Sequence, residues 1–290
     1  MKFGRSEVDS GEILSLPPDQ LDTKRVLTYA NEIVVPEVRF GLPKWGKADL
    51  ENLYPPSTSN PLLYYSSQFN AIEFNAFFYR IFKPEQVVKW RDSSSPDFKF
   101  FPKVPQLISQ FRRLRDVEHL MDEFLFSISH FNEKLGSCFL QMHPTFSPES
   151  FSDLRSFIQN WPSDLALAVE VRHPSWYGDL EHFNNLCELL EKHNISHILT
   201  DTVGRRDLLH MRLTNSTAFV RFTAANHPTD ENRIDEWVER LKSWTEQGLE
   251  RIYFFSHIHA EKESPFIPAM FVEKLNQELN LKLSVPKIMT

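Results

Sequence analysis

Ionisable side chains stand at the ends of apolar, strand-like runs throughout the 290-residue sequence. Strand residues alternate between two faces, so the run FNAIEFNAFFYRI directs Glu73 and Asn75 to one face. The run AVEVRHPSW directs Glu170 and Arg172 to one face in the same way. Two carboxylates near arginines can have their pKa values pushed apart, which supplies an acid and a base near neutral pH. We therefore expect Glu73 and Glu170 to be catalytic.

Further runs carry a polar side chain within them or near their carboxyl ends: Lys103, Gln141, Asp201, Arg221 and His257. Lys103 would polarise a carbonyl or phosphate group, or form a Schiff base if it is desolvated, and is the third catalytic candidate. Arg172 and Arg221 would orient an anionic group, and the other polar side chains would bind the substrate. Because three carboxylates balance three cations at these positions, a purely structural network of salt bridges is the alternative.

The elements that must position these residues are short apolar runs that alternate with helix-like segments. The runs are Val38–Leu42, Ala71–Asn75, Phe98–Lys103, Ser137–Met142, Ala166–Arg172, Ser196–Asp201, Ala218–Thr223 and Arg251–Ser256. Asn60-Pro61 and Ser147-Pro148 are helix start signals, and Gly136 and Gly248 are stop signals. Eight strands, each followed by a helix, predict an α/β fold of the (β/α)8 TIM type, in which sites form at the carboxyl ends of the strands. A doubly wound sheet is the second interpretation.

The expected organisation is a single domain with an N-terminal extension. Residues 37–280 would form the barrel, residues 1–36 the extension and residues 281–290 a C-terminal tail. The spacing Gly41-Leu-Pro-Lys-Trp-Gly46-Lys47 matches a phosphate-binding loop, but Ala48 replaces the hydroxyl that would hold Mg²⁺. We interpret this match as a coincidence, and no Gly-x-Gly supports a dinucleotide site.

Composition excludes several classes of protein. With 32 Lys and Arg against 39 Asp and Glu, the net charge of −7 argues against a broad nucleic-acid-binding surface. No apolar stretch approaches the ~18 residues of a membrane span, and the start lacks the apolar core of a signal peptide. Two cysteines form no disulfide framework and no metal-binding spacing. We therefore expect a cytoplasmic protein without a membrane partner.

Several of these motifs together resemble the YecE-like family, called domain of unknown function 72. The motifs are AVEVRHPSW, FNAIEFNAFFYRI, the K-x-P after the third strand, LGSCFLQMHPTF and AFVRF, and the resemblance covers residues 38–275. It implies a TIM-type barrel similar to the xylose isomerase and endonuclease IV folds, with no established reaction. Its motif positions add Tyr79, His173 and Trp176 to the substrate-binding candidates. The segment FGLPKWG and the pair Ser256-His257 depart from the family pattern.

Two of the remaining candidates have alternative interpretations. Arg205 and Arg206 follow Asp201 in a loop that could hold a phosphate or carboxylate, or could pair with nearby aspartates. Trp176 could be a stacking platform at the barrel mouth or a packed anchor of its loop.

Four functions remain open. The first is an enzyme without a cofactor that acts on a small phosphate- or carboxylate-bearing substrate by carboxylate acid–base chemistry. The second is metal-assisted hydrolysis or isomerisation, although nearby cations would oppose a dication and we expect no metal. Its candidate ligands are Glu73, Glu170, Asp201, His257 and His259. The third is a nucleic-acid-processing barrel by analogy with endonuclease IV, and the fourth is a noncatalytic binding barrel. The oligomeric state stays open with them, as does whether the protein is an enzyme.

Overall fold

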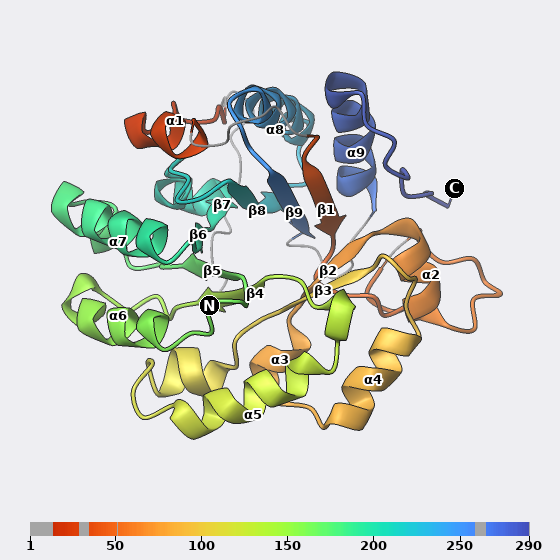
Figure 1. Cartoon of the computed structure of the whole chain (residues 1–290). Coiled ribbons are helices and arrows are strands. Elements are labelled where there is room, and N and C mark those ends of the chain that lie inside the picture. The colour runs from red at the N-terminus through yellow and green to blue at the C-terminus, as the bar shows by residue number, and fades with distance from the viewer. Residues whose placement is uncertain (1–13, 29–34, 51, 259–264, 290) are drawn as a thin grey trace.

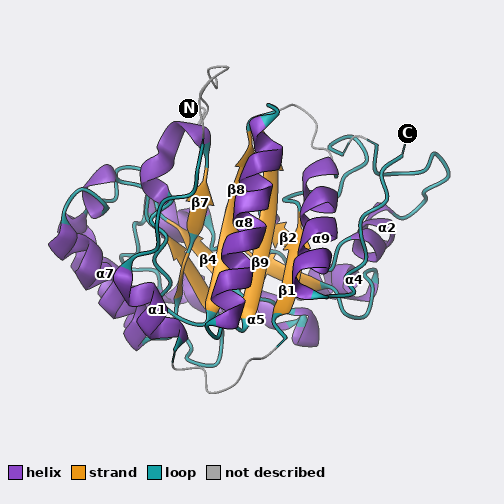
Figure 2. Cartoon of the chain, turned by 90° about the horizontal axis from the view of Figure 1, so that it is seen from above, coloured by secondary structure: helices purple, strands orange, loops and turns teal. Residues whose placement is uncertain are grey.

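The computed structural model describes residues 14–28, 35–50, 52–258 and 265–289. The strands stand in the middle of the molecule and the helices surround them (Figure 1). From above, α8 and α9 cover β8, β9 and β1 (Figure 2). The strands are β1 Glu37–Gly41, β2 Ala71–Phe74, β3 Lys99–Pro102, β4 Cys138–Gln141, β5 Leu167–Glu170, β6 Ser196–His197, β7 Leu199–Asp201, β8 Thr217–Ala224 and β9 Arg251–Ile258.

The helices are α1 Leu21–Leu27, α2 Pro61–Gln68, α3 Ala76–Tyr79, α4 Pro84–Asp92, α5 Glu118–Ser129, α6 Phe151–Gln159, α7 Leu180–Lys192, α8 Thr229–Glu246 and α9 Phe266–Leu279. Short helices in loops are the π-helix η1 Leu107–Phe111 and the 3-10 helices η2 Asn132–Lys134, η3 Pro148–Ser150, η4 Pro174–Trp176 and η5 Val203–Leu208. Each strand-like run of the sequence contains a strand, and the sixth run is divided into β6 and β7. The short helices α1 and α3 carry no strong sequence signal and were not expected.

All strand pairs of the described residues are parallel, and they form three sheets rather than one closed ladder. The orders are β1-β9-β8-β7, β2-β3 and β4-β5-β6. Isolated parallel bridges, Phe100 to Leu135 and Lys103 to Phe139, connect the second sheet to the third. The fold is therefore mixed α/β with parallel sheets, and the closed barrel expected from the sequence is not found as a continuous hydrogen-bonded ring.

The side chain of Asn70, just before β2, connects the two strands β1 and β2 by hydrogen bonds. The Asn70 amide nitrogen donates to the Val38 carbonyl at 2.8 Å, and its oxygen accepts from the Phe40 N–H at 2.8 Å. A Cβ atom on Gly41 would lie 2.0 Å from the Ala71 carbonyl oxygen, so no other residue fits there. The first glycine of the loop that resembles a phosphate-binding motif is therefore explained by the close approach of two strands.

Alternation along the strands divides the apolar residues into two clusters. The larger cluster lies between the strands and the helices. The smaller one fills the space between the strands and consists of Ala71, Phe101, Phe139, Ala168, Ile198, Phe219, Tyr253 and Phe255. Because this inner space is packed with aromatic rings, polar side chains converge only at the carboxyl ends of the strands.

The described segments nearest the two ends of the chain contact α2, α7 and α8. On the N-terminal side, Arg25 pairs with Glu191 of α7 at 2.7 Å, and Asp19 pairs with Arg240 of α8 at 2.5 Å. On the C-terminal side, the N–H of Lys287 donates to the Gln68 side chain at 2.9 Å. No helix in the described ranges is long and apolar enough to cross a membrane.

Candidate functional site

Two carboxylates and one arginine meet where β2 and β5 end, beside the middle of β8. The Arg221 guanidinium donates from Nε to Glu73 Oε2 at 2.8 Å and from Nη2 to Glu73 Oε1 at 2.9 Å. Its Nη1 donates to Glu170 Oε2 at 2.6 Å. Glu73 and Glu170 are fully buried, and a single buried arginine is shared by these carboxylates from two sheets.

Four more side chains complete what we call the inner network, which is centred on Glu73, Glu170 and Arg221. Asn75 Nδ2 donates to Glu73 Oε1 at 2.9 Å, and His257 Nε2 lies 2.9 Å from Glu73 Oε2. Arg172 Nε donates to Glu170 Oε1 at 2.5 Å, and Gln141 Nε2 donates to Glu170 Oε2 at 2.9 Å. The inner network thus brings together seven residues that the sequence singled out.

Both carboxyl groups of the inner network are ionised. Burial by itself would raise the pKa of Glu73, but the charges of Arg221 and His257 hold that pKa well below its usual range. Burial likewise opposes ionisation of Glu170, yet Arg172 and Arg221 lower the pKa of Glu170 to about 2. Both pKa values are lowered because Arg221 stabilises both charges, so neither carboxyl group is the acid near neutral pH that the sequence led us to expect.

Lys103 is the group whose pKa lies near neutrality. It follows β3 and is only 7% exposed, and its Nζ donates to Gln141 Oε1 at 2.8 Å. The amine lies 4.1 Å from the ring centroid of Phe78 and 5.8 Å from that of Phe139. Burial and the charge of Arg221 lower the pKa of Lys103 to about 7. No carboxylate oxygen of the described residues comes within 4 Å of this amine.

Asp201 belongs to a different cluster. In the register of β7 and β8, Thr200 and not Asp201 stands opposite Arg221, so the two residues point to different faces. Asp201 Oδ1 lies 2.7 Å from Arg233 Nη2, and its Oδ2 accepts from Trp237 Nε1 at 2.8 Å, both on α8. The expectation that Asp201 joins the other carboxylates is therefore wrong.

The cluster between β7 and α8 is called the outer network. It consists of Asp201, Arg206, Asp230, Arg233 and Trp237, in which Arg206 Nη1 pairs with Asp201 at 2.5 Å and Arg233 Nη1 pairs with Asp230 at 2.8 Å. Arg206 thus takes the aspartate-pairing role that the sequence allowed for it.

Four other candidates are Trp176, His173, Arg205 and Tyr79. Trp176 is fully buried, donates to the Phe146 carbonyl at 2.7 Å and anchors its loop. His173 Nδ1 accepts from the Ser175 N–H at 3.3 Å. Arg205 Nη2 donates to the Arg172 carbonyl at 2.7 Å, which supports the loop of that arginine. Tyr79 is 72% exposed.

Sequence reasoning missed two residues that touch Lys103 or its partner. Phe78 provides the ring beside the amine, and only the aromatic run FFYR at that position hinted at it. Gln110 donates to the Gln141 carbonyl at 2.6 Å from a loop without a recognisable motif.

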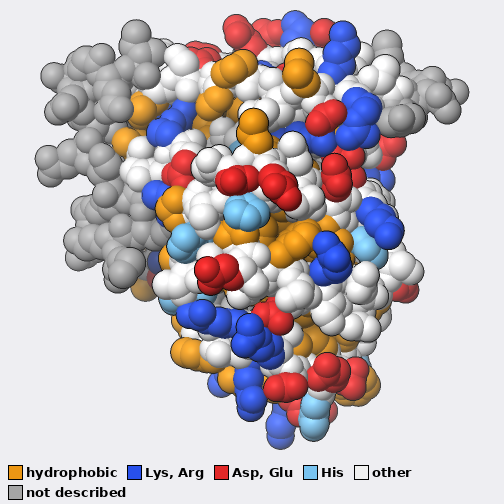
Figure 3. Space-filling model, turned by 90° about the vertical axis from the view of Figure 1, so that its left-hand side faces the viewer, with side chains coloured by type: hydrophobic (Ala, Val, Ile, Leu, Met, Phe, Trp, Pro, Cys, Tyr) orange, Lys and Arg blue, Asp and Glu red, His pale blue; other side chains and the backbone are white. Residues whose placement is uncertain are grey.

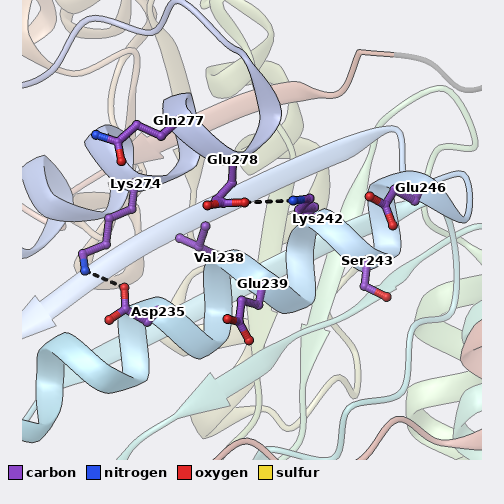
Figure 4. A pocket seen from close by; sticks show the side chains of 9 residues that line it. All are labelled: Asp235, Val238, Glu239, Lys242, Ser243, Glu246, Lys274, Gln277 and Glu278. Carbon is purple, nitrogen blue, oxygen red and sulfur yellow. Dashed lines mark hydrogen bonds and ion pairs between the residues drawn. The ribbon is translucent and has the colours of Figure 1, made fainter.

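One face of the molecule and the groove between α8 and α9 give no sign of another centre for the predicted residues. On the face shown in Figure 3, Lys and Arg side chains are interspersed with Asp and Glu side chains. A groove of about 610 Å³ between α8 and α9 contains pairs of surface charges, Lys274 with Asp235 and Lys242 with Glu278 (Figure 4). None of the predicted site residues lines it.

Metal ligands are not grouped in the described part of the chain. No three His, Cys, Asp or Glu residues of that part lie together as a metal site would require. Within the inner network, the oxygens of Glu73 and Glu170 already accept hydrogen bonds from Arg221. His259 lies outside the described residues.

Comparison with known sequences gives three findings. Residues 39–289 match the family described as "Protein of unknown function DUF72". The chain is 27% identical to the UPF0759 protein YecE of Escherichia coli (strain K12) over 270 residues, which cover 87% of this chain and 97% of that protein. It is 29% identical to the UPF0759 protein YunF of Bacillus subtilis (strain 168) over 151 residues, which cover 49% of this chain and 52% of that protein.

Solved structures of DUF72 family proteins have a similar fold. The structure from Enterococcus faecalis V583 has a TM-score of 0.63 at 21% identity and covers 85% of this chain and 99% of its own. The structure from Thermotoga maritima MSB8 has a TM-score of 0.62 at 23% identity and covers 83% of this chain and 99% of its own. These similarities concern the fold, and they agree with the mixed α/β arrangement of parallel sheets.

Proposed function

The chain belongs to the family described as Protein of unknown function DUF72, as its motifs predict, and from this premise we propose that it is an enzyme acting on a small anionic substrate, with Lys103 as the proton-transferring group. The observation that carries this proposal is the environment of Lys103. Its amine is buried beside Phe78 and Phe139 and donates a hydrogen bond to Gln141, and burial lowers its pKa to about 7. A group that changes protonation state near the working pH is suited to acid–base catalysis.

The carboxylates have a positioning role in this proposal. Glu170 accepts from the Gln141 amide nitrogen, and this contact turns the Gln141 oxygen toward the Lys103 amine. Because the Gln141 oxygen accepts one N–H of Lys103, the other hydrogen-bonding positions of the amine are available to a substrate. Glu73 and Glu170 hold Arg221 in place and are too acidic to carry a proton at neutral pH.

An anionic substrate fits the charge of the site. Arg172 and His257 have side chains that are 13% and 19% exposed, so they lie nearer the solvent than the two carboxylates of the inner network. A phosphate or carboxylate bound there would contact these two side chains first, and a protonated Lys103 would be stabilised by it. Arg221 is committed to the two glutamates and holds the site together from within.

We further propose that the strands form a (β/α)8 barrel whose ring is completed by side chains. Strand order around the middle of the molecule follows chain order, which supports this arrangement (Figure 1). The bridges between β3 and β4 and the Asn70 hydrogen bonds between β1 and β2 support continuity at two of the breaks.

Both cysteines are free and buried, which supports a cytoplasmic location for the protein.

The proposal is tested by titrating phosphate, sulfate and sugar phosphates into the wild type and Lys103→Met while thermal unfolding is recorded. The matched control is Lys99→Met, since Lys99 begins the same strand and donates to the Glu133 carbonyl at the other end. We expect the anion to raise Tm for the wild type and for Lys99→Met but not for Lys103→Met. The shift should be larger at about pH 6 than at about pH 8, because the ammonium form binds the anion.

Phosphorus NMR of each bound ester then distinguishes an enzyme from a binding protein. Conversion by the wild type and Lys99→Met, with loss in Lys103→Met, is the expected result. Binding without conversion would favour the noncatalytic barrel, and activity lost on dialysis against a chelator would favour metal-assisted chemistry. Equal anion shifts in the wild type and Lys103→Met would overturn the proposal.

A further inference from the structure

An apolar groove adjoins Lys103 on the side of α3 and α5. It has a volume of about 450 Å³. Its lining comes from the end of α3, from the π-helix η1 with the residues before it, and from α5. Phe78 is the shared element, because its ring lies 4.1 Å from the Lys103 amine and the same residue lines the groove. The groove and the proposed site therefore meet at one aromatic ring.

Large apolar side chains are exposed along this groove. Tyr79 is 72% exposed, Leu107 is 43% exposed and Phe111 is 69% exposed, and all three line it. Exposed apolar residues gathered around one hollow mark a binding surface, whereas isolated ones do not. Arg80 and Glu123 also line the groove, so its lining combines apolar side chains with two charged ones.

The backbone of the loop after β3 has an unusual conformation. Residues Leu107–Phe111 form a π-helix, in which the Arg112 N–H donates to the Leu107 carbonyl at 2.9 Å. Immediately after it, Arg113, Leu114 and Asp116 have φ values of 51°, 70° and 50° in the left-handed region. Such helices and left-handed non-glycine residues are uncommon and concentrate at functional sites.

This loop is also connected to the Lys103 site through Gln110. Its amide nitrogen donates to the Gln141 carbonyl at 2.6 Å, and the side chain of Gln141 accepts from Lys103 and donates to Glu170. The π-helix is therefore held at a defined position relative to the amine. A ligand that fills the groove and reaches the amine would contact one preorganised surface.

We infer that the substrate carries an aryl or alkyl group, which lies in the groove between α3, η1 and α5 while its anionic group contacts Lys103. This inference rests on the proposed function and specifies its substrate class. The occupant is a small amphipathic anion, since the apolar lining suits its body and the single buried amine beside Phe78 suits its charge. Phe78 would stack on the apolar part next to the anionic group.

The test compares the binding of phenyl phosphate and methyl phosphate by isothermal titration calorimetry. Both ligands carry the same phosphate monoester, so the difference between their affinities measures what the groove contributes to binding. We expect phenyl phosphate to bind wild type about tenfold more tightly or better, because burying a ring adds apolar contact area. Phe111→Ser should lose most of that advantage and leave the affinity for methyl phosphate unchanged. Phe126→Ser is the matched control, since Phe126 is 64% exposed on α5 but does not line the groove.

The outcomes separate the two proposals. If methyl phosphate and phenyl phosphate both fail to bind, the proposed function is overturned and this inference falls with it. If both bind equally, or if Phe111→Ser and Phe126→Ser behave alike, the groove inference alone is overturned. Lys103→Met should weaken the binding of both ligands. A loss of affinity confined to phenyl phosphate would contradict the position assigned to the anionic group.

Discussion

The inner and outer networks use the same chemistry in two different settings. Each pairs buried carboxylates with a buried arginine, Arg221 in one and Arg233 in the other. In the outer network, α8 covers the charges, and Asp201 has Arg206, Arg233 and Trp237 as partners. In the inner network, the residues at the edge are partly exposed, and Lys103 has no carboxylate within 4 Å in the described chain.

This difference shows that a buried ion pair is not by itself a sign of function. Asp201 and Arg233 connect β7 to α8, and their opposite charges balance each other. Burial lowers the pKa of Lys103, so the charged form of this amine is held in the fold at a cost in stability. The predictions below test this distinction from the largest expected effect to the smallest.

The largest effect is expected for Arg221→Met. It leaves Glu73 and Glu170 without their shared partner, and breaking a buried pair in this way destabilises a protein by about 3–5 kcal/mol. Arg233→Met should destabilise less, because Asp201 keeps Arg206 and Trp237. Urea unfolding of both variants measures the difference. Equal losses would mean that the two networks are energetically equivalent.

Lys103→Met should stabilise the fold near pH 6. The pKa of Lys103 is lowered to about 7 in the folded protein from 10.5, so the unfolded chain binds more protons between these values. The stability of the wild type therefore rises with pH across that interval, and this rise disappears in the variant. We expect a gain on the order of 2–4 kcal/mol at about pH 6. Tm measured against pH is the readout, and a variant less stable than wild type at about pH 6 would refute it.

Glu170→Gln should make the free energy of unfolding depend less on pH in the acidic range. The pKa of Glu170 is lowered to about 2, so its contribution is present above the unfolded pKa of 4.5 and is lost as pH falls through about 2. We expect the wild type to lose about 1–3 kcal/mol more than the variant over this window. The exposed Glu118→Gln is the control, and equal slopes in all three proteins would show that Glu170 is solvated.

The smallest effect on stability is expected for Tyr79→Ser. Because Tyr79 is 72% exposed, the change should alter the free energy of unfolding by about 0.5 kcal/mol or less. Trp176→Phe should cost more, since Trp176 is fully buried and would lose its hydrogen bond to the Phe146 carbonyl. Denaturant midpoints of the two variants check the order, and a reversed order would show that Tyr79 is packed in solution.

The contrast between the networks also explains where sequence reasoning succeeded. In FNAIEFNAFFYRI and AVEVRHPSW, the alternation predicts that Glu73 and Glu170 face inward, and both reach Arg221. It failed at Asp201, because the sixth run is divided at Ile198 into strands of two and three residues, too short to define which face is which. Parallel strands are buried on both faces, so hydrophobicity does not distinguish the two sides.

The amino-acid sequence by itself determined the order of the elements, the family and the carboxyl-end position of the polar residues. These follow from periodicity, from capping residues and from motifs, all of which are local. Only the tertiary structure decided that Asp201 binds α8, that Trp176 is buried and that both glutamates share one arginine. The lowered pKa of Lys103 likewise depends on burial and on the charge of Arg221, which comes from a distant part of the chain. Partners and burial are properties of packing between distant segments, and no spacing along the chain encodes them.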